Sequence, residues 1–233
     1  MIVFNLDKAL EDPDYPGLRI AGEFTAVEQY LTLLSEYLPT VRDQTRLRSE
    51  AELRRKYPQH LRADFAEEYE QIEWVSNTLV PKFFLGTFVL ASWAAFDVAS
   101  AAIAAYVQKK ESVRLRLADL RSSDGWEKLR LYLETLWSST VPISDTDTHQ
   151  IKALQLLRNL FAHANGSLSF ERDNSRRDSI KKLVAANVGV SLAKDDILVS
   201  ENFLRSSFAS LEAAINLVLS EVDKHYFKSV PDE

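Results

Sequence analysis

The segment from Phe83 to Tyr106 constrains the fold most strongly, because Asp97 is its only charged side chain. About 20 consecutive apolar residues are enough to cross a bilayer. A helix that is apolar on all sides is equally suited to the centre of a soluble bundle. The segment is rich in alanine, and a carboxylate at bilayer depth costs on the order of a few kcal/mol, which alanine does little to offset. We therefore predict a buried bundle helix, with a membrane-anchored helix as the alternative.

Glycine and proline are scarce, with six and seven residues among 233. Sandwiches and barrels need many tight turns, so this composition favours long helices and an all-α, up-and-down bundle. The chain has no cysteine, which excludes disulfides, thiolate metal sites and cysteine nucleophiles and fits a reducing cytoplasm. No basic region leads into a long apolar stretch at the N-terminus, so we expect no signal peptide.

Apolar residues three or four positions apart predict most of the elements, which follow an irregular lead-in over residues 1–20. The predicted helices are Glu23–Leu38 ended by Pro39, a charged stretch to Tyr57, residues 61–79, Phe83–Tyr106, Asp124–Trp137, a helix ending at His163 or Ala164, residues 175–186, and a last helix capped by Ser200. Alternation over residues 188–199 predicts a small β-hairpin before that last helix. No repeat or long linker divides the chain. We expect one domain, with residues 1–60 as a helical extension and residues 61–228 as its core.

The net charge of −6 excludes general attraction to nucleic acid, so an RNA site needs a local basic patch. Two basic clusters qualify, and acidic residues interrupt both. The first contains Arg42, Arg46, Arg48, Arg54, Arg55 and Lys56, and the second contains Arg172, Arg176, Arg177, Lys181 and Lys182. The alternative for each cluster is a solvated helix face with no partner.

The helix that ends near His163 separates an apolar face from a polar one. With 100° per residue, Leu154, Leu157, Leu160, Phe161 and Ala164 fall on one arc, which is the predicted buried face. Asn159 and His163 lie four positions apart on the opposite face, and Arg158 can reach that face from its flank. Asn165-Gly166 follows, a pair suited to the left-handed conformation that ends helices.

The side chains of Arg158, Asn159 and His163 suit a phosphodiester substrate. An arginine can hold two phosphate oxygens, a histidine can transfer a proton near neutral pH, and an asparagine can orient the reacting group. The carbonyls at a helix C-terminus also favour a positively charged imidazole at His163. The alternative is structural, with Arg158 paired to a surface acid and His163 at the helix end.

Arg158-Asn159, followed by His163 at a helix end and then by Asn165-Gly166, resembles the Arg-x4–6-His motif of the HEPN superfamily, in which Asn commonly follows the Arg. The all-helical context and the hairpin before the last helix also fit. Asp97 resembles the acidic position that many members carry on an earlier helix, although a buried structural carboxylate is an equal alternative. The resemblance covers about residues 65–225.

The resemblance implies a metal-independent endoribonuclease without a cofactor, in which the 2′-OH of the RNA attacks the adjacent phosphate. It makes Arg158, Asn159 and His163 the catalytic residues, with Asp97 and Asn165 in support. It further implies a cytoplasmic homodimer, with RNA as substrate and with a role in toxin–antitoxin or defence systems under an antitoxin or other regulatory protein. HEPN toxins with a nucleotidyltransferase antitoxin often carry Tyr at the position of Asn165, so this chain departs from that pairing. The alternative function is a non-catalytic HEPN module for dimerisation or RNA binding.

Overall fold

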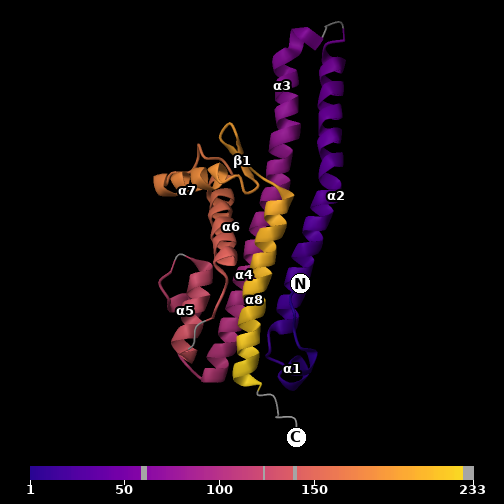
Figure 1. The fold of residues 1–233 in the computed structure, drawn as a ribbon. Helices are drawn as coiled ribbons and strands as arrows, with labels where there is room; N and C mark the ends of the chain where they lie inside the picture. Colours follow the sequence, from indigo (N-terminus) through magenta and orange to yellow (C-terminus); the bar gives the residue numbers. More distant parts are fainter. Residues whose placement is uncertain (59–61, 123, 139–140, 228–233) are drawn as a thin grey trace. The chain divides into compact units, whose positions relative to one another are not determined.

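The computed structural model describes residues 1–58, 62–122, 124–138 and 141–227, and it confirms a helical bundle with a two-stranded hairpin before the last long helix (Figure 1). In chain order the elements are α1 (Leu6–Glu11), α2 (Gly17–Lys56), the 3₁₀ helix η1 (Arg62–Phe65), α3 (Ala66–Trp74), the π-helical turn η2 (Val75–Leu79), α4 (Val80–Glu111), the 3₁₀ helix η3 (Leu117–Asp119), α5 (Gly125–Trp137), α6 (Asp145–Ala164), α7 (Asn174–Ala185), β1 (Val190–Ala193), β2 (Asp196–Val199) and α8 (Glu201–Tyr226).

The chain forms two compact units, each assembled from separate stretches of sequence. The first unit contains Met1–Glu28, Ala91–Leu156 and Arg205–Glu233, and the second contains Gln29–Leu90 and Leu157–Leu204. The helices α2, α4, α6 and α8 each contribute residues to both units. The single domain with an extension over residues 1–60 stays a prediction.

Two predictions for the N-terminal part were wrong. Residues 1–20 are not irregular, because they contain α1, whose N-cap Asn5 accepts the N–H of Asp7 at 2.9 Å, and the start of α2. Pro39 does not end a helix but lies inside α2. A proline removes one helical hydrogen bond, and tertiary contacts lie on both sides of this one. Tyr30 and Thr87 share a hydrogen bond of 2.7 Å, and Arg42 donates to Asn77, within the second unit.

The apolar segment lies in a longer helix than expected, because α3, η2 and α4 run on continuously from Ala66 to Glu111. The π-helical turn η2 precedes Pro81, which has no N–H to donate, and the N–H of Val80 bonds to the carbonyl of Val75. Among the described residues this is the one helix long and apolar enough to cross a membrane, and 56% of its most apolar window is buried. Core helices of soluble proteins share these properties, so localisation stays a prediction.

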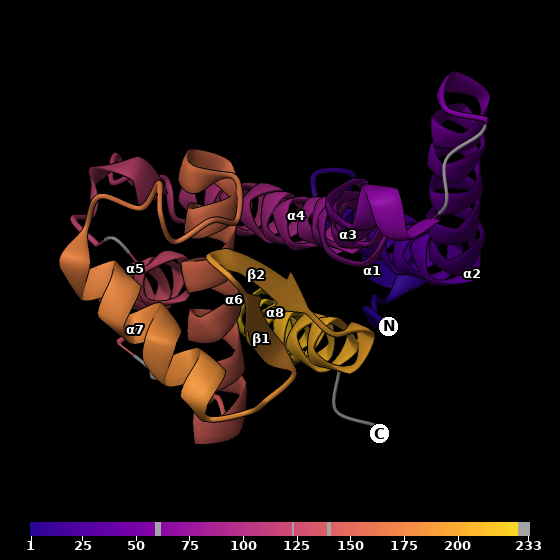
Figure 2. The same cartoon turned by 90° about the horizontal axis from the view of Figure 1, so that it is seen from above.

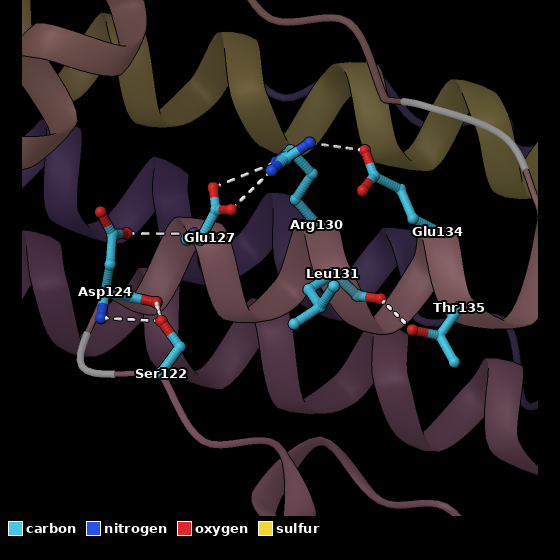
Figure 3. A network of polar contacts seen from close by, with 7 residues as sticks. All are labelled: Ser122, Asp124, Glu127, Arg130, Leu131, Glu134 and Thr135. Carbon is cyan, nitrogen blue, oxygen red and sulfur yellow. Dashed lines mark hydrogen bonds and ion pairs between the residues drawn. The ribbon is translucent and has the colours of Figure 1, made fainter.

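In the first unit, α5 shows how local signals build an amphipathic helix. The Asp124 side chain caps it by accepting the N–H of Glu127 at 3.0 Å, and Arg130 is held between Glu127 and Glu134 on the polar face (Figure 3). On the other face Trp126 and Leu129 are buried. The helix ends at Trp137, and the C-cap residue Ser138 has a φ of 54°. The predicted range Asp124–Trp137 is therefore confirmed, since capping and periodicity both act within the helix.

Three tyrosines of the first unit, of which Tyr15 and Tyr106 are buried and Tyr226 is half-buried, bond to carboxylates. Tyr15 donates to Asp223 at 2.9 Å, Tyr106 donates to Asp12 at 2.8 Å, and Tyr226 donates to Glu111 at 2.6 Å. Burial raises the pKa of each tyrosine, and the accepting carboxylate raises it further. These contacts join α8 and α4 to the N-terminal residues within the unit.

We expect the free energy of unfolding to fall steeply as the pH rises above about 10. Because the tyrosine pKa values are higher in the folded state, the unfolded chain loses protons first, and each tyrosine contributes up to about 1.4 kcal/mol per pH unit. The stabilisation is fully present below that pH. Urea unfolding between pH 8 and pH 11.5 measures the slope, which Tyr106→Phe should reduce. The control Tyr37→Phe, at an exposed position, should leave it unchanged; equal slopes in all three proteins would contradict the assignment.

Candidate functional site

The C-terminal end of α6 carries the predicted motif, and its two faces are as expected. Leu157, Leu160 and Phe161 are buried, whereas His163 is exposed. Arg158 and Asn159 are half-buried. Ser144 caps the start of this helix by accepting the N–H of Asp147 at 3.0 Å.

The chain reverses direction directly after the motif and joins the hairpin. Asn165 and Gly166 have φ values of 52° and 72°, as predicted for the end of the helix, and the Gly166 N–H bonds to the carbonyl of Leu160 at 3.2 Å. The Gly166 carbonyl then accepts the N–H of Ile197, and the N–H of Leu168 donates to the carbonyl of Asp195, both at 2.8 Å. The segment after His163 is thereby bonded to β2, and β1 of the same hairpin follows α7 in the chain (Figure 2).

A buried ion pair links the hairpin to α4 inside the second unit. The Lys82 Nζ lies 2.9 Å from the Asp196 Oδ1, and the two side chains are only 5% and 13% exposed. Asp196 belongs to β2 and also forms the β-bridge with Ser167. The ion pair therefore holds β2 against α4, and β2 is the strand to which the segment after His163 is hydrogen-bonded.

The ring of Phe161 fits between two glycines. A Cβ atom at Gly86 of α4, or at Gly166, would lie 2.5 Å from the Phe161 Cε1. Real side chains do not approach so closely, so both positions require glycine for the ring to stay in place. Gly166 also needs glycine because of its positive φ.

We expect Gly86→Ala to lower the free energy of unfolding by about 1–3 kcal/mol, because the new methyl group overpacks the Phe161 ring. The matched control is Gly22→Ala, since Gly22 lies in α2 with nothing within 4 Å of an added Cβ. There the gain in helix propensity should stabilise the protein by up to about 1 kcal/mol. Chemical denaturation of both variants measures the difference. Stabilisation by both substitutions would contradict the close contact.

A pocket of about 790 Å³ lies against the end of α6, within the second unit. His163 and Asn165 line it together with Phe170, Glu171, Arg172 and Arg177. The structure thus brings the predicted histidine to two arginines of the second basic cluster. The sequence indicates these arginines only as a basic cluster, and no motif or spacing in it indicates Phe170 or Glu171.

Arg158 and Asn159 interact with each other, since the Arg158 Nη1 donates to the Asn159 Oδ1 at 3.0 Å. Neither residue is among those that line the pocket. Asp97 belongs to the first unit, whereas the motif belongs to the second. Asp97 is exposed, so the alternative of a buried structural carboxylate was wrong.

Within the described residues, neither the first basic cluster nor His149 or His225 lines this pocket. In the first basic cluster, Arg46 and Arg54 pair with Asp43 and Glu50 along α2, which is the arrangement of a solvated face. His149 bonds to the Asp145 carbonyl at 2.6 Å, and His225 stacks on Trp137. His60 lies outside the described residues. Among those residues no group of three or more histidine or acidic side chains could hold a metal ion.

Comparisons with known proteins find no relative. No family model matches the chain, and neither a curated protein nor a solved structure is significantly similar to it.

Proposed function

We propose that the protein is an endoribonuclease of HEPN type that cleaves RNA without a metal ion. The observation that carries this proposal is the pocket in which His163 meets Arg172 and Arg177. A histidine near neutral pH can transfer a proton, and arginines can bind and neutralise phosphate oxygens. These are the two requirements of a reaction that adds charge to a phosphate.

In the proposed reaction the ribose 2′-OH attacks the adjacent phosphorus, and the bond from phosphorus to the 5′-oxygen breaks. The products are a 2′,3′-cyclic phosphate and a free 5′-OH, and the proton lost by the 2′-oxygen is balanced by one delivered to the 5′-oxygen. His163 acts in this proton transfer, and Arg172 and Arg177 stabilise charge on the phosphate oxygens. Arg158 and Asn159, joined by their hydrogen bond, orient the backbone of the RNA at the helix end.

The other expectations from the HEPN resemblance belong to the same proposal. They are a homodimer, a cytoplasmic location without membrane attachment, control by an antitoxin or other regulatory protein, and a role in toxin–antitoxin or defence systems. Asn165 lines the pocket beside His163 and supports that side of the site.

The test is an RNA cleavage assay with purified protein in EDTA. We expect cleavage of single-stranded RNA, and we expect mass spectrometry of the fragments to find 2′,3′-cyclic phosphate and 5′-OH ends. Arg172→Ala and Arg177→Ala should each slow the reaction, whereas Arg176→Ala is the matched control, because Arg176 pairs with Asp173 and does not line the pocket. Cleavage that requires a divalent metal ion, or that leaves 5′-phosphates, would contradict the proposal.

A second candidate function is a non-catalytic module that binds RNA. It is favoured by one observation, namely that Arg158 bonds to Asn159 and does not line the pocket with His163. RNA binding that requires Arg172 and Arg177, together with no cleavage under any condition, would select this function.

A further inference from the structure

Two buried polar atoms of the pocket wall have no hydrogen-bond partner in the part of the chain that the structure describes. Glu171 is 5% exposed, and its Oε1 accepts the N–H of Asp173 at 2.9 Å, but its Oε2 has no donor. The Nε of Arg177 has no acceptor, although the Nη2 of the same side chain donates to the Ser169 carbonyl at 3.4 Å. An unsatisfied buried polar group is unfavourable and requires an explanation.

Both residues line the pocket that contains His163. A ligand there can satisfy both atoms if it brings a hydrogen-bond donor for the carboxylate and an acceptor for the guanidinium. The last torsion of a glutamate side chain is soft, so a small rotation can present Oε2 to the pocket while Oε1 remains near the Asp173 N–H. The unpaired atoms therefore indicate a ligand that carries both a hydrogen-bond donor and a hydrogen-bond acceptor.

An exposed aromatic ring lines the same pocket as these polar atoms. Phe170 also lines the pocket, and it is 70% exposed although it is a large apolar side chain. Proteins that bind single-stranded RNA stack unpaired bases on exposed rings of this kind. An exposed ring that lines the same pocket as one unpaired carboxylate oxygen and one unpaired guanidinium nitrogen is suited to a planar, polar ligand such as a nucleobase.

We propose that the pocket binds a guanine base of single-stranded RNA. Guanine presents the N1–H and N2–H groups side by side as donors, which a carboxylate can accept, and it presents O6 and N7 as acceptors, which arginine recognises. Glu171 binds the donor edge, Arg177 binds the acceptor edge, and Phe170 stacks on the ring. Arg172 and His163 then lie beside the phosphate of the same nucleotide.

This inference rests on the proposed function for its substrate, because it assigns the nucleotide that the nuclease selects. The attacking 2′-OH belongs to the ribose of the guanosine whose base Glu171 binds, so cleavage is expected on the 3′ side of guanosine. Binding of the base, however, can be measured without any cleavage.

The experiment measures the binding of nucleoside 3′-monophosphates to the full chain by isothermal titration calorimetry. Guanosine 3′-monophosphate should bind about 5- to 150-fold more tightly than its adenosine, cytidine and uridine counterparts. The inosine nucleotide, which lacks the N2 amino group, should bind with intermediate affinity. Glu171→Gln keeps the shape of the side chain and an oxygen for the Asp173 N–H, and it should abolish the preference for guanine.

Two further variants make the result specific. Phe170→Ala should weaken the binding of all four nucleotides, because stacking does not depend on base identity. Asp178→Asn, at an exposed position of α7 outside the pocket, should change nothing. Circular dichroism melts of each variant establish that it is folded before its affinity is interpreted.

Equal affinity for the four nucleotides, no binding of any of them, or a guanine preference that survives Glu171→Gln would each overturn the inference. The outcomes also separate it from the proposed function. Guanine-selective binding without RNA cleavage would support the guanine site and contradict the proposed nuclease activity. Cleavage after all four bases, unchanged by Glu171→Gln, would contradict the guanine site and support the proposed nuclease activity.

Discussion

Replacing His163 with alanine should slow RNA cleavage by about 10²- to 10⁴-fold, which is the usual contribution of a group that transfers protons in catalysis. The imidazole is exposed, lines the pocket, and has no hydrogen-bond or ion-pair partner within the described residues. The free energy of unfolding should therefore change by less than about 1 kcal/mol, mainly through the lost interaction with the helix C-terminus. Single-turnover cleavage measured beside urea unfolding separates the two effects.

The matched control for His163 is His149→Ala. Both histidines are exposed and lie on α6, but His149 is near the start of the helix, bonds to the Asp145 carbonyl, and does not line the pocket. Its replacement should leave cleavage unchanged. Equal rates for the His163→Ala variant and the parent protein would remove His163 from the mechanism, and an equal loss in both variants would show that the effect is not specific to the pocket.

Replacing Lys82 with alanine should lower the free energy of unfolding by about 3–5 kcal/mol. Lys82 is 4% exposed, and its loss leaves the carboxylate of Asp196 buried without its cation. Removing one partner of a buried ion pair is far more unfavourable than removing both. We therefore expect the double variant Lys82→Met, Asp196→Asn to be more stable than the Lys82→Ala variant. Guanidinium unfolding of the single and double variants measures both values.

The control for Lys82 is Lys109→Ala. Lys109 pairs with Asp14, but both side chains are more than half exposed, so the loss should be below about 1 kcal/mol. Equal effects of the two lysine substitutions would contradict the buried character of the Lys82 pair. Because Asp196 belongs to the strand bonded to the segment after His163, Lys82→Ala should also weaken nucleotide binding in the pocket.

Most element boundaries could be predicted because they depend on neighbours in sequence. Asp124 caps α5, Ser200 caps α8 by accepting the N–H of Phe203 at 3.2 Å, and the hairpin follows the alternation of its residues. Pro39 was one exception, as were α1 and the continuous helix from Ala66 to Glu111. A proline usually ends a helix, but α2 continues through Pro39, and Tyr30 and Arg42 on either side of it bond to residues far away in the sequence. Tertiary contacts can override the intrinsic helix propensity of a single residue.

The candidate site could be predicted only in part. The spacing of Leu157, Leu160 and Phe161 correctly placed His163 on the exposed face of its helix. It also placed Arg158 near the same face, but the structure adds the hydrogen bond to Asn159, which helical periodicity does not specify. Periodicity reports which side of a helix is buried, not which side chains from later segments lie opposite it.

At the end of α6 the sequence alone specifies where the helix stops, but it does not specify which residues surround His163. Asn165-Gly166 determined by itself that the helix stops, because these two residues tolerate the positive φ values that turn the chain. Only the tertiary structure decided what faces His163 after the turn. The hydrogen bonds of Gly166 and Leu168 to the hairpin, about 30 residues later, bring Phe170, Glu171 and the arginines into one pocket. Pairing between distant segments depends on how the whole unit packs, and no local preference encodes it.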